Sequence, residues 1–119
     1  MPRSVLLVES DKDLAETVNA MLSVLDYPVT VQDNDTRALA VMHGVRFGLL
    51  VTTLRRGEEQ SLLFAREAKL LIPDLKVMVI TGSGPRMGLA GGPFDAVLHK
   101  PFDIAALSAT VAALTGHAS

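Results

Sequence analysis

Hydrophobic and polar positions follow two different periods along the chain. Short apolar runs, typical of buried strands, are separated by longer segments in which apolar residues recur at helical spacing. The first pair shows both patterns. Residues 4–8 are mostly apolar, and within residues 11–25 one helical face carries Leu14, Val18, Met21, Leu22 and Leu25. The pattern predicts a strand followed by a helix.

The same unit recurs along the rest of the chain. Further strands are expected at residues 28–32, 47–52, 76–81 and 95–99. A second helix should begin at the capping side chains of residues 33–35 and close at Gly44, and a third should run from Glu58 to about Ile72, where Pro73 stops it. Asp103 should cap the last helix. The glycine-rich residues 82–92 leave room only for a short or irregular helix.

Five such units, each with a nearly continuous apolar strand, indicate an α/β fold in which helices cover both faces of a parallel sheet. Functional residues of such sheets collect at the carboxyl ends of the strands, where the strand order reverses. The residues expected there are Glu9, Ser10 and Asp11 after the first strand, Thr53 after the third, Thr81 at the end of the fourth, and Lys100 with Pro101 after the fifth.

Length and composition indicate a single domain over residues 1–119, with 49% hydrophobic and 20% charged residues in 12.7 kDa. A net charge of -2 and a pI near 5.8 give little support for binding nucleic acid by this domain alone. The absence of cysteine excludes disulfides and thiolate chemistry and is compatible with the cytoplasm. No apolar run approaches the ~18 residues of a membrane helix.

Three segments together resemble a response-regulator receiver domain of two-component signalling. They are Val-Leu-Leu-Val-Glu-Ser-Asp at 5–11, Val-Ile-Thr-Gly at 79–82 and Leu-His-Lys-Pro-Phe at 98–102. The resemblance covers essentially the whole chain. It implies the CheY-like, flavodoxin-like fold, a doubly wound (βα)5 parallel sheet with strand order 2-1-3-4-5.

The resemblance also implies roles for the residues at the strand ends. In that family an acidic pair after the first strand holds Mg²⁺, and an aspartate after the third strand accepts phosphate. A hydroxyl after the fourth strand and a lysine before a cis-proline bind the phosphoryl oxygens, and an aromatic residue on the fifth strand reports the state. By this comparison Glu9, Thr81, Lys100 and Pro101 keep the residue type of the family.

Three other positions have changed type. Ser10 stands at the second acidic position, Thr53 at the phosphoacceptor and Val97 at the switch aromatic. A hydroxyl is a poor nucleophile without an adjacent base, and Mg²⁺ prefers carboxylate ligands. We therefore expect no metal, no cofactor and no enzymatic activity, and we expect Lys100 to pair with Glu9.

Each change has an alternative interpretation. Ser10, with Asp13 three positions later, fits a capping box that simply starts the first helix. Thr53 could be the target of a Ser/Thr kinase, which would add a charge of about -1.5 to -2 beside Lys100. Glu9 or Asp11 could serve as a non-standard phosphoacceptor, and the fold by analogy could host a small molecule. The glycine-rich segment lacks the ending of a P-loop, and the three histidines have no metal-ligand spacing.

The last helix carries the clearest positive signal. Residues 104–115 contain no charged side chain, and Ile104, Leu107, Val111 and Leu114 form its apolar face. The opposite face is made of small residues, notably Ala105, Ala106, Ala109, Ala112 and Ala113. Small residues permit close approach of another helix, although alanine also suits a surface helix by propensity alone. We expect an atypical receiver that acts through this helix by docking to a protein partner or to itself, without aspartyl phosphorylation.

Overall fold

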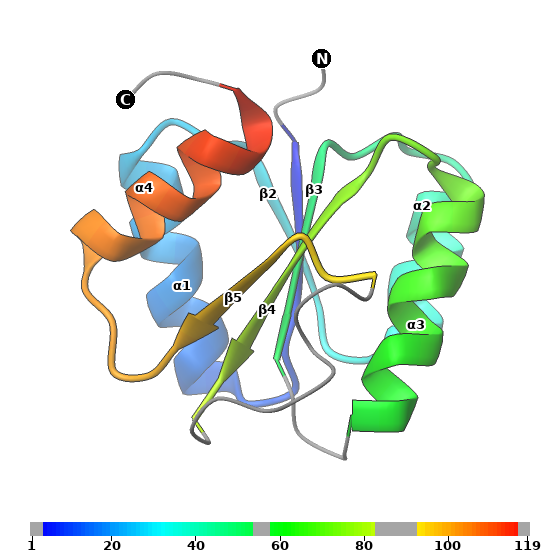
Figure 1. The fold of residues 1–119 in the computed structure, drawn as a ribbon, viewed down its shortest axis with the longest axis horizontal. Helices are drawn as coiled ribbons and strands as arrows, with labels where there is room; N and C mark the ends of the chain where they lie inside the picture. The colour runs from blue at the N-terminus through cyan, green and yellow to red at the C-terminus, as the bar shows by residue number, and fades with distance from the viewer. Residues whose placement is uncertain (1–3, 54–57, 83–92, 117–119) are drawn as a thin grey trace.

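The computed structural model describes residues 4–53, 58–82 and 93–116. They form a five-stranded parallel sheet of order β2-β1-β3-β4-β5, which confirms the predicted fold. Helices α1 and α4 lie on one face of the sheet, and α2 and α3 cover the other (Figure 1). The strands are β1 (Val5–Val8), β2 (Val29–Gln32), β3 (Leu49–Thr53), β4 (Lys76–Thr81) and β5 (Ala96–His99). The described helices are α1 (Lys12–Val24), α2 (Asp35–Met42), α3 (Glu58–Leu71) and α4 (Ile104–Thr115).

Most element boundaries agree closely with the sequence pattern, and β4 agrees at both ends. The third strand differs, because it begins at Leu49 and includes Thr53, which the sequence placed just after the strand. The short helix expected within residues 82–92 falls on residues 83–92, which lie outside the described ranges.

Two hydrophobic layers sandwich the sheet, because successive side chains of a strand point to opposite faces. On β3, Leu50 packs with Phe64 in the α2–α3 layer. Its neighbours Leu49 and Val51 pack with Leu107 in the α1–α4 layer. Burial on both faces explains why the central strands are apolar at nearly every position.

Backbone pairing sets the strand ends at a common edge. The parallel register aligns Val8 of β1 with Thr52 of β3, and Thr53 with Ile80 of β4. Lys100 follows β5 directly, and its N–H donates to the carbonyl of Thr81 at 2.9 Å. The predicted edge of functional residues is therefore fixed by main-chain hydrogen bonds rather than by the side chains themselves.

Helix starts are fixed by side-chain caps, and one of these corrects an expectation. Asp103 caps α4 through the N–H of Ala106 at 2.8 Å, as predicted. The first helix is capped by Asp11, which accepts from the N–H groups of Asp13 and Leu14 at 3.0 and 3.2 Å. The capping role predicted for Ser10 is therefore wrong by one residue, because the chain turns into helical geometry only after Asp11.

Asp95 fastens the start of β5 to β4 and α3. Its N–H donates to the carbonyl of Val77 at 2.7 Å, and its Oδ2 accepts the N–H of Val77 at 2.8 Å. The same oxygen forms an ion pair with Lys69 Nζ on α3 at 2.8 Å. Since β5 leads into Lys100, this junction also positions part of the functional edge.

Replacement of Asp95 by alanine should lower the free energy of unfolding by about 1–3 kcal/mol, because it leaves a polar N–H on the fully buried Val77 without its acceptor. Urea denaturation measures the change. Asp95→Asn keeps an acceptor oxygen and should lose less. Equal stability of the alanine variant and the wild type would contradict this role.

Candidate functional site

Glu9 lies at the end of β1 and is almost fully buried, with 3% of its surface exposed. Its Oε2 accepts the N–H of Asp11 at 2.8 Å, and the Asp11 carboxylate in turn caps α1. Both acids of this turn therefore hold the transition from β1 to α1. Ser10 between them is exposed.

The tip of β3 carries two hydroxyls in succession. Thr53 is half-buried, whereas Thr52 is 4% exposed. By the alternation of side chains along a strand, Thr52 shares the face of Leu50 and looks toward α2 and α3. The carboxyl end of this strand thus presents hydroxyl groups and no carboxylate of its own.

The end of β5 differs from one expectation. The peptide bond between Lys100 and Pro101 is cis, as the receiver resemblance implies. The Lys100 side chain is exposed, and within the described ranges no ion pair joins it to Glu9. The predicted pairing is therefore wrong. The Glu9 carboxylate is buried and directed to the main chain of the β1–α1 turn, while the lysine extends into solvent.

A cleft of about 200 Å³ opens between the ends of β1 and β3 and the first turns of α2 and α3. Its described lining is mostly polar and includes the apolar Val8 and Phe64. The described polar residues that line it are Glu9, Ser10, Asp33, Asn34, Asp35, Thr36, Thr52, Thr53, Gln60 and Ser61. Glu9, Ser10 and Thr53 thus meet as predicted, but Thr81 and Lys100 are not among the lining residues.

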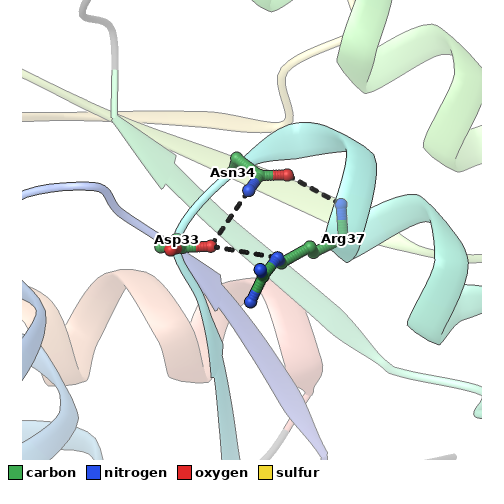
Figure 2. Close-up of polar contacts among 3 residues, drawn as sticks. All are labelled: Asp33, Asn34 and Arg37. Atoms are coloured by element: carbon green, nitrogen blue, oxygen red, sulfur yellow. Dashed lines mark hydrogen bonds and ion pairs between the residues drawn. The ribbon is translucent and has the colours of Figure 1, made fainter.

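The wall formed by the β2–α2 turn is held by local polar contacts (Figure 2). Asn34 Oδ1 accepts the N–H of Arg37 at 2.8 Å, and Asn34 Nδ2 donates to Asp33 Oδ1 at 3.0 Å. Arg37 Nε lies 3.8 Å from the same carboxylate oxygen. Sequence reasoning recognised this turn as a helix cap but missed it as a wall of the cleft, because only the folded sheet brings it beside β3.

Comparison with known proteins gives the family. No family model matches the chain. It is 35% identical over 106 residues to the response regulator receiver protein CpdR of Brucella abortus, covering 86% of this chain and 88% of that protein. This chain belongs to the response-regulator receiver family.

Two further matches agree with this family assignment. The transcriptional regulatory protein DctD for C4-dicarboxylate transport, from Rhizobium meliloti, is 27% identical over 103 residues, which span 83% of this chain but only 22% of that protein. A CheY-like receiver domain from Methanospirillum hungatei superposes with a TM-score of 0.85 at 18% identity, over 98% of this chain and 95% of the other. The second match concerns the fold alone.

The receiver's described residues do not fit the Mg²⁺ ion that the resemblance implies. Among them, no three His, Asp or Glu side chains come close enough together to hold a metal. Glu9 and Asp11 are engaged with main-chain N–H groups, and the neighbouring positions supply the hydroxyls of Ser10 and Thr53. Neutral hydroxyls are weak substitutes for the carboxylates that Mg²⁺ prefers.

Val97, at the position of the switch aromatic, lies on β5 opposite Val79 of β4. It is half-buried and packs against the α2–α3 layer. Nothing aromatic is thus presented by β5 at this position.

The receiver's last helix matches its predicted faces in part. Leu107 and Val111 are fully buried, and Ala105, Ala109 and Ala113 are exposed along one stripe. Two placements were wrong. Ala106 packs against the α1–α4 layer, and Ile104, assigned to the buried face, is 39% exposed. The buried residues of α4, Leu107 and Val111, lie in its middle, whereas Ile104 and Ala105 in its first turn are exposed. Ala112 is half-buried.

No described helix is long and apolar enough to cross a membrane.

Titration of the receiver with Mg²⁺ should give no saturable binding in the millimolar range, because carboxylates are missing at positions 10 and 53. NMR chemical-shift changes would report binding. The double variant Ser10→Asp with Thr53→Asp should gain a site. Saturable binding by the wild type, mapped to Glu9, would refute the assignment.

Proposed function

We propose that this receiver domain signals through protein contacts and does not store an aspartyl phosphate. The observation that carries the proposal is the tip of β3, where the chain places Thr53 instead of a carboxylate. An acyl phosphate requires a carboxylate nucleophile, and a threonine hydroxyl is weakly nucleophilic without an adjacent base.

The other acids near the cleft are poor replacements for that acceptor. Glu9 is 3% exposed, and its Oε2 accepts a main-chain hydrogen bond. Asp11 accepts two N–H groups at the start of α1, so a phosphoryl group on it would compete with the helix cap. Both carboxylates support the fold in a way that is hard to combine with phosphoryl transfer.

A phosphorylated receiver also needs a side chain that changes conformation in response to the phosphoryl group. Val97 is an aliphatic residue packed against the α2–α3 layer, and a short branched side chain of this kind has little freedom to change its rotamer. Thr81 is 1% exposed, and Lys100 extends into solvent. Thr81 and Lys100, which would bind the phosphoryl oxygens, are thus present, but position 53 has no carboxylate to carry the phosphoryl group.

Helix α4 supplies the contact surface in this proposal. It carries no charge over its length, and Ala105, Ala109 and Ala113 form a smooth exposed stripe. Small side chains allow another helix to approach closely, and the absence of charge lowers the cost of removing water from the surface. The occupant is a protein partner or a second copy of this domain.

Incubation with acetyl phosphate and Mg²⁺ should leave the mass of the wild-type protein unchanged, because no accessible carboxylate stands at the tip of β3. Intact-mass spectrometry detects one added phosphoryl group. The Ser10→Asp, Thr53→Asp variant serves as the positive control. A stoichiometric adduct on the wild type, mapped by peptide analysis to Glu9 or Asp11, would overturn the proposal.

A charge placed on the α4 stripe should weaken the contact. We expect Ala109→Glu to reduce self-association, or affinity for a purified partner, by at least about tenfold, because an unpaired carboxylate would be buried. Light scattering over a concentration series and calorimetry measure the two cases. Ala20→Glu, on the exposed face of α1, is the matched control. If both variants behave alike, the contact lies elsewhere.

A further inference from the structure

The outer face of α3 is more apolar than contact with water alone favours. Among the described residues seven large apolar side chains are exposed, and three of them belong to this helix. They are Leu63, Leu70 and Leu71, with 54%, 81% and 36% of their surface exposed. Leu63 and Leu70 are seven residues apart and therefore lie on one side of the helix, two turns from each other and opposite the buried Ala65 and Ala68. Apolar side chains grouped in this way mark a contact surface more often than isolated ones do.

Two opposite charges flank this pair of leucines. Successive helix residues are about 100° apart, so Arg66 lies on one side of the line from Leu63 to Leu70, and Glu67 lies on the other. Both side chains are exposed, and within the described ranges neither takes part in an ion pair or a hydrogen bond. No residue three or four positions away from either one carries the opposite charge. The helix thus presents two charges without supplying a partner for them.

A second copy of α3 supplies a partner for each charge. In a parallel pair of helices related by a two-fold axis, each side of one helix faces the other side of its partner. Arg66 then faces Glu67 of the second copy, and Glu67 faces the Arg66 of that copy. Each leucine meets the same leucine across the axis. Two charge-assisted contacts therefore flank a short apolar seam.

Antiparallel pairing fits the same surface less well. With Leu63 opposite Leu70, it brings the same sides of the two helices together, so Arg66 meets Arg66 of the second copy and Glu67 meets Glu67. These like charges repel. A shifted antiparallel pair that matched Arg66 with Glu59 would leave Leu70 beyond the first residue of the partner's helix. Charges beside an apolar seam set the orientation of paired helices, and here they favour the parallel one.

We propose that α3 is a self-association surface through which two copies of this receiver form a weak parallel dimer. The helix has 14 residues and is therefore about 21 Å long, so the seam is short and the dimer dissociates readily on dilution. The surface lies on the opposite face of the sheet from the α4 stripe (Figure 1). The α3 contact therefore does not depend on the contact proposed for α4.

Sedimentation of the Ala109→Glu variant, at concentrations up to about 1 mM, tests the proposal without a contribution from the α4 stripe. This protein should dimerise reversibly. Adding Arg66→Glu should weaken the dimer at least about tenfold, because acidic side chains then face each other across the axis. The exchange Arg66→Glu with Glu67→Arg restores opposite charges and should restore dimerisation. A protein that stays monomeric in the Ala109→Glu background, or an exchange that restores nothing, would overturn the proposal.

The apolar part of the seam has its own variant and control. Leu70→Gln keeps helix propensity and removes the most exposed leucine, so it should weaken the dimer at least about fivefold while the melting temperature stays near that of the parent. Lys12→Glu makes the same change in charge as Arg66→Glu on the exposed start of α1 and should leave dimerisation unchanged. Equal effects of Lys12→Glu and Arg66→Glu would show a response to net charge and would contradict the contact.

Disulfide cross-linking reports the orientation, because the chain has no cysteine of its own. Under mild oxidation, a mixture of the Leu63→Cys and Leu70→Cys variants should give mainly dimers of each variant with itself, since a parallel pair brings each position close to its own copy. A predominance of the mixed dimer would indicate an antiparallel pair and would refute the proposed arrangement.

Discussion

The in-register pairing of β1 with β3 is the constraint on which the rest of this structure depends. It places Val8 beside Thr52 and so brings the β1–α1 turn to the tip of β3. Buried main-chain N–H and C=O groups have no water to bond to, so they must stay paired between the strands. A slip of the register by one residue would also move each side chain to the opposite face of the sheet. Every candidate residue of the cleft and of the strand ends takes its position from this pairing.

The carboxylates of Glu9 and Asp11, at this edge of the sheet, stabilise the fold through hydrogen bonds to main-chain N–H groups. Glu9 accepts a main-chain N–H from inside the protein, and Asp11 satisfies two N–H groups at the start of α1. A helix start leaves several N–H groups without partners, and a carboxylate is a favourable acceptor there because it also opposes the helix dipole. Acidic residues in this turn therefore have a structural role that does not depend on phosphorylation.

The two surfaces singled out by the structure lie on opposite layers. The α4 stripe belongs to the α1–α4 layer, whereas the cleft is bounded by α2 and α3 (Figure 1). Between them runs the sheet, whose side chains are close-packed on both faces.

The sequence by itself determined the order and type of the elements, because apolar runs and helical periodicity report which faces are buried. It also determined that position 53 carries a hydroxyl and that the last helix is uncharged, because both follow from residue identity alone. It misplaced the cap of α1 by one residue, the orientation of Ile104 and Ala106, and the pairing of Lys100. The cap depends on where the backbone becomes helical, and the three side-chain placements depend on neighbours that are distant in sequence. In the sequence, Thr52 is one more residue of an apolar strand, and only the tertiary structure shows that it lines a cleft. The other lining residues come from segments that are distant in sequence and that meet only when the strands pair.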